Sequence, residues 1–303
     1  MLDIDSISVL CDLLECEKPK HPLISVIDYG SIKTLENFTD TSYVQNFYVI
    51  SLKNGTDCEM KYGRKYYDFS EGSLVFTAPG QILGSGEGKI RPQVNTDGWM
   101  LCVHPDLIKG SSLWRKMAEY SFFEYEANEA LHLSDEERIR IERTLDNIKE
   151  EYSANIDTFS KDLIIANLEV FLSYSKRFYN RQFITRTTIN KEIVSQFESL
   201  LNESCASDNL QTKGQPSVKG LAGIMNYSPN YLSDMLKKET GKTAQEHIKL
   251  HILELAENLL LTTDEPIYMI AEKLGFDQPA SFTKFMKTQH GITPIDFRKQ
   301  HIN

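Results

Sequence analysis

The sequence lacks the features that mark membrane-bound and secreted proteins. No stretch approaches the ~20 apolar residues that a helix needs to cross a bilayer. The opening MLDIDSISVLCDLLEC has acidic residues inside its apolar run and no basic leader, so we expect no signal peptide. The five cysteines are an odd number spread along the chain, which favours reduced thiols in the cytoplasm over a disulfide framework.

An excess of basic residues is also missing. The chain carries 33 Lys and Arg against 43 Asp and Glu, a net charge of −10, which argues against nucleic acid as a partner. Residues 191–303, however, hold 12 basic and 14 acidic side chains, so the rest of the chain carries −8 of the total. A balanced domain binds DNA where its basic groups are segregated, as Lys284, Lys287, Arg298 and Lys299 are. We expect modest non-specific affinity with marked salt dependence.

Clustered metal ligands are absent from the first part of the sequence. Residues 1–130 contain only His21 and His104, far apart and without a His-x-His pair, whereas cupin enzymes bind metal through clustered His and Glu. Cys11 and Cys16 are too isolated from other ligands to indicate zinc. We therefore expect no metal, no other cofactor and no enzymatic activity.

What the sequence does contain is one pattern written twice near its C-terminus. Residues 231–237 (YLSDMLK) correspond to residues 281–287 (SFTKFMK), and GKT at 241–243 corresponds to GIT at 291–293, both with an offset of 50. The apolar stretches upstream correspond with an offset of 49, so the second turn is one residue longer. We call the two copies the first and the second motif.

Each motif has the pattern of a helix, a tight turn and a second helix. Apolar residues three and four positions apart precede Asn226 or Gly275, and these two residue types tolerate a left-handed backbone. Ser228 followed by Pro229 is a helix start, because Ser caps and Pro suits the first helical position. Thr293-Pro294 predicts one more short helix in the same way.

Between the motifs, residues 243–261 predict a long helix with a Thr243/Glu246 capping box. A helix-turn-helix unit offers its second helix to the major groove, and two units held apart could contact groove segments roughly 34 Å apart. The alternative is a helical repeat that only builds a protein-binding domain. Two copies weaken that alternative, because solenoids usually need at least three.

These residues resemble the AraC/XylS family of bacterial transcription regulators from about residue 217 to residue 300. The resemblance rests on LAGIMNYSPNYLSDMLKKETGKT and on IAEKLGFDQPASFTKFMKTQHGITPIDFR. It implies a DNA-binding domain of two helix-turn-helix units joined by a linker helix. The chain departs from the family at Asn226, where Gly is usual, at Ile252, where Arg is usual, and at Ser281-Phe282, where an aromatic pair is usual.

The resemblance also implies which residues contact DNA. The implied base-reading residues are Asn230, Ser233, Asp234, Ala280, Thr283 and Lys284. Asn pairs with adenine, Lys with guanine and an Asp carboxylate with a cytosine amino group. We expect the DNA backbone to be contacted by Lys237, Lys238, Lys287 and Arg298, which position the protein without reading sequence. Any single surface Lys could equally be a solvated side chain.

The first part of the chain has the pattern of short strands. Runs at residues 23–29, 43–52, 65–69 and 73–77 are separated by turn residues and predict a small antiparallel barrel or sandwich. The order of domains fits the family's usual cupin-like sensory domain. Candidates to line an effector pocket in the barrel are Tyr48, Phe76, Gln81, Arg91 and Trp99, although most could equally be ordinary core.

Two helices are expected after the barrel. Ser134 and Glu137 form a capping box for the first, and residues 163–174 are apolar around much of the second, which could pack on the barrel or form a dimer interface. We predict an α+β chain in four segments: a cupin-like sensory domain at 1–130, a helical pair at 131–180, a linker at 181–190 and an all-α DNA-binding domain at 191–303. Its first helix should run from 191 to about 203, followed by a polar loop at 204–216.

The function that this organisation favours is a transcription regulator controlled by a small effector. Its expected partners are promoter DNA, the effector, a second copy of the chain and, if it activates, RNA polymerase, with no role for a membrane. One alternative is a cupin-type metalloenzyme with a helical appendage. A second is a helical adaptor that binds only proteins.

Overall fold

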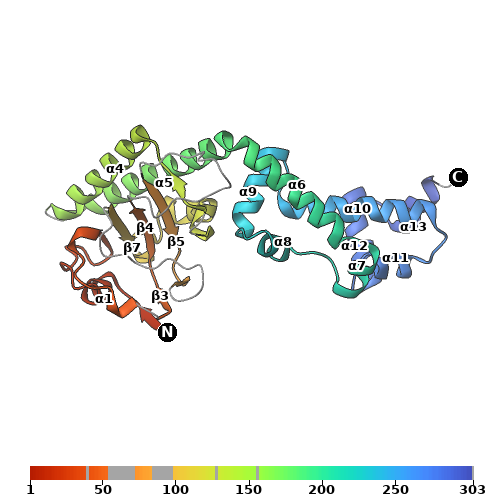
Figure 1. Ribbon diagram of the computed structural model, residues 1–303, viewed down its shortest axis with the longest axis horizontal. Coiled ribbons are helices and arrows are strands. Elements are labelled where there is room, and N and C mark those ends of the chain that lie inside the picture. The colour runs from red at the N-terminus through yellow and green to blue at the C-terminus, as the bar shows by residue number, and fades with distance from the viewer. Residues whose placement is uncertain (39–40, 54–71, 84–97, 127–128, 155–156, 302–303) are drawn as a thin grey trace. The chain divides into compact units, whose positions relative to one another are not determined.

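The computed structural model describes the chain outside residues 39–40, 54–71, 84–97, 127–128, 155–156 and 302–303 (Figure 1). The chain divides into an N-terminal unit, Met1–Arg186, and a C-terminal unit, Thr187–Asn303. The N-terminal unit combines strands with helices, and the C-terminal unit is helical, which confirms the predicted α+β class. Within the described residues, every helix is too short or too polar to span a membrane.

The strands of the N-terminal unit form two sheets. A small sheet has the order β1-β3-β6, and a larger one has the order β2-β7-β4-β5-β8. The strands are β1 Leu2–Ile4, β2 Ile24–Asp28, β3 Tyr43–Gln45, β4 Tyr48–Lys53, β5 Ser73–Thr77, β6 Ile82–Leu83, β7 Gly98–Val103 and β8 Leu131–His132. Neither sheet closes on itself over the described residues, so the cupin-like barrel is not confirmed.

Three of the four predicted strands lie within the described residues, and one of these three is observed as two separate strands. Residues 73–77 are β5, residues 23–29 contain β2, and residues 43–52 are interrupted between β3 and β4. At the interruption, Phe47 is fully buried in the core, and the two strands that flank it belong to different sheets. The strand predicted at 65–69 lies outside the described residues.

Helices pack on both faces of the larger sheet (Figure 1). The helices of this unit are α1 Ile7–Leu13, α2 Pro105–Ile108, α3 Ser112–Lys116, α4 Asp135–Ser153 and α5 Ser160–Thr185, with 3-10 turns η1 Tyr29–Ser31, η2 Glu36–Phe38, η4 Met117–Glu119 and η5 Ser121–Glu124. On one face Trp99 meets Phe171 of α5 edge to face. On the other, Cys102 and Val49 pack in one core cluster with Ile7 of α1.

The C-terminal end of α5 is tied to strand β8 by hydrogen bonds. Gln182 is fully buried, accepts from the His132 N–H at 2.8 Å and donates to the Ala130 carbonyl at 3.1 Å. Arg181 donates to the His132 carbonyl at 2.6 Å and pairs with Glu137 at 2.5 Å. Among the described strands, β8 pairs only with β5, so its other edge has no neighbouring strand. The side chains of Gln182 and Arg181 supply hydrogen-bond partners for the backbone groups on that edge.

Every described secondary-structure element of the C-terminal unit is a helix. They are α6 Thr187–Ser204, α7 Ser207–Lys213, α8 Val218–Ile224, α9 Pro229–Thr240, α10 Ala244–Thr262, α11 Ile267–Lys273, α12 Pro279–His290 and α13 Pro294–His301. Helix α6 begins four residues before the predicted start at 191 and follows α5 after Arg186 alone. The predicted linker at 181–190 is therefore helical, and the predicted polar loop at 204–216 contains α7.

Candidate nucleic-acid interface

The first motif is α8, a turn at Asn226 and α9. Asn226 has φ +58°, the left-handed backbone expected for the turn. Ser228 caps α9 by accepting from the Tyr231 N–H at 3.2 Å, and Pro229 occupies the first helical position as predicted. Leu232 and Met235 are fully buried, so the side of α9 that carries them faces the core.

The second motif repeats this arrangement with α11, Gly275 and α12. Helices α9 and α12 begin at Pro229 and Pro279, and α8 and α11 begin at Val218 and Ile267, which confirms the offsets of 50 and 49. Phe282 and Met286 take the buried positions. In contrast to α9, α12 has no side-chain cap at Gln278, so its first-turn N–H groups are not occupied by a capping side chain.

The linker helix α10 joins the two motifs. The predicted capping box is present, with the Thr243 N–H donating to Glu246 at 2.7 Å. Ile248 on the N-terminal half of α10 is buried, and Ala256 on the other half belongs to the core cluster of the second motif. Ile252, where the family usually has Arg, is 1% exposed. This residue is therefore part of the core here, which explains the departure by packing.

The predicted base-reading residues lie on the sides of α9 and α12 that point away from the buried residues of each helix. Asn230, Ser233 and Asp234 are half-buried on α9, whereas Ala280 and Lys284 are exposed on α12. The remaining member, Thr283, is half-buried and donates its hydroxyl to the Pro279 carbonyl of its own helix at 3.1 Å. Each helix thus presents three of the six residues on one side.

The four predicted backbone contacts divide into two kinds. Lys237, Lys238 and Lys287 are exposed near the C-terminal ends of α9 and α12. Arg298 is instead half-buried and donates from Nε to the Leu260 carbonyl at 3.1 Å, at the end of α10. This guanidinium therefore closes the C-terminus of the linker helix, a role that the sequence did not indicate.

Electrostatics near the linker helix favour an uncharged His247. Burial against Phe197, whose ring lies edge to face at 5.7 Å, lowers the pKa of His247, and the Lys242 ammonium lowers it further. The His247 Nε2 lies 2.7 Å from the Thr240 hydroxyl at the end of α9. The Thr243 N–H holds the pKa of Glu246 below its usual range in the same turn. The contact between Thr240 and His247 therefore links the end of α9 to α10.

Comparison with known proteins places this domain. A family model described as a helix-turn-helix domain matches residues 221–300. The chain is 37% identical over 82 residues to the transcriptional regulator YobQ of Bacillus subtilis, covering 27% of this chain and 34% of YobQ. It is 36% identical over 82 residues to the regulatory protein SoxS of Escherichia coli, covering 27% of this chain and 77% of SoxS. The chain belongs to the AraC/XylS family of transcription regulators.

Residues 221–300, which hold both motifs, are therefore an AraC-type DNA-binding region. Among solved structures, the C-terminal domain of the response regulator yesN from Fusobacterium nucleatum is 32% identical, with a TM-score of 0.30, and is similar over 34% of this chain and 93% of that one. The chain spans less than two thirds of the length of YobQ. The N-terminal unit of this AraC-family chain lies outside the matched residues 221–300.

The predicted effector residues take two places in the N-terminal unit. Tyr48 and Phe76 lie against the Phe123 ring, with centroids 5.0 and 5.5 Å away, and Gln81 donates to the Phe123 carbonyl at 3.0 Å. Trp99 packs on α5 instead, as described above, and Arg91 lies outside the described residues. Phe123, which these three residues contact, is not among the residues predicted from the sequence, although the aromatic pair in SFFE marks its position.

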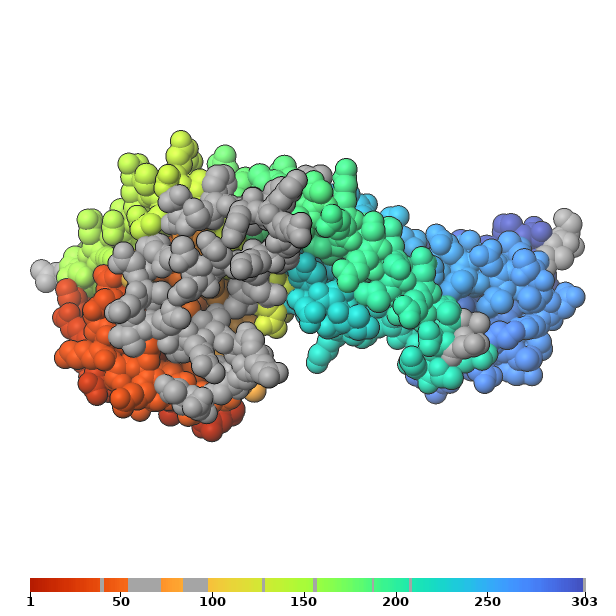
Figure 2. Space-filling view, in the orientation of Figure 1, coloured from red at the N-terminus to blue at the C-terminus, as the bar shows by residue number. Residues whose placement is uncertain are grey.

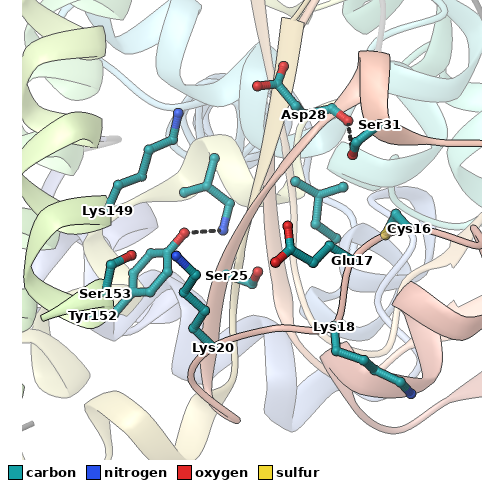
Figure 3. Close-up of a pocket in the computed structure, with 12 residues that line it drawn as sticks. Cys16, Glu17, Lys18, Lys20, Ser25, Asp28, Ser31, Lys149, Tyr152 and Ser153 are labelled. Atoms are coloured by element: carbon teal, nitrogen blue, oxygen red, sulfur yellow. Dashed lines mark hydrogen bonds between the residues drawn. The ribbon is translucent and has the colours of Figure 1, made fainter. Parts of the chain in front are cut away.

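A pocket opens elsewhere in this unit, beside strand β2 (Figure 3). It has a volume of about 310 Å³ and is lined by residues 16–18 and Lys20, by β2 and by the end of α4. Lys20 and Lys149 border it together with Tyr152, whose hydroxyl accepts from the Val26 N–H at 3.1 Å. Within the described residues, no group of three or more His, Cys, Asp or Glu is placed to hold a metal ion.

Proposed function

We propose that this protein is a cytoplasmic, non-enzymatic regulator that binds promoter DNA through α9 and α12. The observation that carries the proposal is a pair of helices, α9 and α12, that begin 50 residues apart at Pro229 and Pro279. Each turns a polar side away from its buried residues, and the linker helix α10 joins the two motifs. A helix of this kind enters the major groove, where its side chains meet base edges. Family membership supports DNA as the partner.

The two helices are expected to contribute differently. Asn230 and Asp234 on α9 offer the mixed donors and acceptors that discriminate base pairs. Helix α12 offers Lys284 and Lys287, and its uncapped first turn can donate to a phosphate. We therefore assign most sequence discrimination to α9 and most of the electrostatic contribution to α12.

The test is fluorescence anisotropy with a DNA fragment selected by the full chain from a random library. The double change Asn230→Ala and Lys284→Ala should weaken specific binding by roughly 2–6 kcal/mol, because each good base contact contributes about 1–3 kcal/mol. The control is the double change Asn202→Ala and Lys191→Ala, which removes the same groups from α6. Unchanged specific affinity in the first variant would overturn the assignment of these residues.

We infer that a small effector bound by the N-terminal unit controls DNA binding. The pocket beside β2 supports this, because Lys20, Lys149 and the Tyr152 hydroxyl border one space between a strand and a helix. In a reporter strain, Lys149→Glu should abolish the response to the inducing condition while leaving DNA affinity in vitro unchanged. If Tyr48→Ala abolishes it and Lys149→Glu does not, the aromatic residues around Phe123 form the site instead.

We also propose that α5 pairs two copies of the chain. Its solvent side carries residues at alternating spacings of four and three, the spacing of a coiled-coil seam: Phe159, Leu163, Ala166, Val170, Ser173, Arg177, Asn180 and Ile184. Phe159 is 68% and Ile184 58% exposed. In sedimentation velocity, Val170→Glu should give monomers at concentrations where the wild type and Glu150→Gln on α4 are dimeric. A wild-type monomer would refute the pairing.

A further inference from the structure

Helix α7 and the loop after it connect parts of the DNA-binding domain that are distant in sequence. We call residues 206–216 the strap. It lies between α6 and the first motif in the chain, yet α7 packs against α11 of the second motif as well as against α6. Figure 2 shows its teal surface meeting the blue of the second motif. Leu210 at the centre of α7 is 1% exposed, so α7 is anchored rather than loosely attached.

The strap contacts the turn of the second motif with both side chain and backbone. Gln215 donates from Nε2 to the Leu274 carbonyl, which ends α11, at 3.0 Å. Gly275 has φ +72°, and a Cβ placed on it would lie 2.9 Å from the Leu210 carbonyl oxygen and 3.1 Å from the Gln215 nitrogen. The backbone of the strap therefore occupies the space that any larger residue at this turn would need.

The turn of the first motif holds Asn226 at the corresponding place. Asn226 has the same left-handed backbone, with φ +58°, and its side chain is exposed. The turn chemistry alone would thus accept Asn in either motif. The requirement for Gly at position 275 comes from the strap, which makes the two turns unequal even though their helices correspond residue for residue.

We propose that the strap fixes the distance and the angle between the two recognition helices, with Leu210 and Gln215 as positioning residues that do not contact DNA. Helix α10 is one connection between the motifs, and a single connection leaves each motif able to pivot at one end. The strap is a second, independent connection, from the first motif's side of the domain to the turn of the second. The proposal rests on the proposed function, because it concerns how two DNA-reading helices are spaced.

A rigid spacing has a measurable consequence for the choice of operator. Two linked binding modules gain affinity only when the link matches the distance between their sites, and a stiff link penalises every other distance. We call the groove segment that one recognition helix contacts a box, so the selected operator contains two boxes. The wild-type chain should therefore bind this operator far better than versions with one base pair added or removed between the boxes. A loosened strap should flatten this preference and leave binding to each single box as it was.

The experiment measures these affinities by anisotropy for the full-length wild type, Leu210→Ala, Gln215→Ala and two controls. The measured quantity is the affinity for the operator with the native spacing divided by the affinity for the operator with the altered spacing. Leu210→Ala and Gln215→Ala should both reduce this ratio, and Leu210→Ala should reduce it by roughly tenfold. The conservative variant Leu210→Met and the exposed neighbour Gln211→Ala should keep the wild-type ratio. A merely structural role would lower single-box affinity instead.

Each other outcome decides against the inference. A wild-type spacing ratio in Leu210→Ala, with native circular dichroism, overturns the positioning role. If Leu210→Ala does not fold, the ratio in Gln215→Ala decides alone, and an unchanged ratio there overturns it. A wild-type chain that binds single boxes but shows no spacing preference refutes the strap while DNA binding stands, whereas a wild-type chain that binds no DNA refutes both proposals.

Discussion

Replacing Gly275 by Ala measures how tightly the strap presses on the turn, and Gly291 supplies a matched comparison. Both glycines have the same backbone, with φ +72° and φ +78°. A Cβ at Gly291 would meet no atom within 4 Å, whereas one at Gly275 would meet the backbone of Leu210 at 2.9 Å. The pair therefore separates the strain of a left-handed Ala from the collision with the strap.

The expected magnitudes follow from these two contributions. A left-handed Ala costs about 1–2 kcal/mol relative to Gly, so Gly291→Ala should lower the free energy of unfolding by that amount. Overpacking against backbone that cannot rotate away costs a further ~1–3 kcal/mol. Gly275→Ala should therefore lower the free energy of unfolding by roughly 2–5 kcal/mol.

Urea denaturation with two probes makes the assay specific to one unit. Both tryptophans, Trp99 and Trp114, lie in the N-terminal unit, so their fluorescence reports that unit alone. Circular dichroism at 222 nm follows the helical C-terminal unit as well. Gly275→Ala should shift the dichroism transition and leave the fluorescence transition unmoved. Equal losses in Gly275→Ala and Gly291→Ala would refute the tight contact between strap and turn.

Three further predictions concern other parts of the chain. Burial lowers the pKa of His247 below its ordinary 6.5 in the folded state, so the unfolded chain binds the proton first as the pH falls. The free energy of unfolding of the C-terminal unit should therefore decrease as the pH drops below about 6.5. In urea titrations at pH 7.5 and 5.5, His247→Gln should show a smaller decrease than the wild type. Gln182→Ala leaves two buried backbone groups unsatisfied and should lower the free energy of unfolding by about 2–5 kcal/mol, measured by tryptophan fluorescence, whereas the exposed Asn147→Ala on α4 should change it little. Lys287→Ala should weaken binding evenly across DNA sequences and reduce the salt slope by about 1, which Lys191→Ala should not do.

Much of the C-terminal unit could be predicted because its local signals agree with its packing. Ser228-Pro229 and the Thr243/Glu246 box begin helices in the sequence and in the structure, and the repeat offsets hold to the residue. The Ser134/Glu137 box of α4 is confirmed in the same way. Caps of this kind act within one turn of helix, so they are visible without knowledge of the fold.

The elements that were missed depend on contacts from distant parts of the chain. Residues 181–185 continue α5 because Gln182 finds its partners on β8, some 50 residues earlier. Helix α7 has one buried apolar residue, Leu210, and is too short to show a period. The role of Arg298 at the end of α10 was hidden for the same reason, because Leu260 lies 38 positions away.

The hydrogen bonds of Gln182 and Arg181 make the last turns of α5 part of the edge of the larger sheet. Because α5 is helical as far as Thr185, the final residues of the N-terminal unit form one rigid element with β8. A change in the position of this strand is therefore passed along α5 to the last residues of the N-terminal unit.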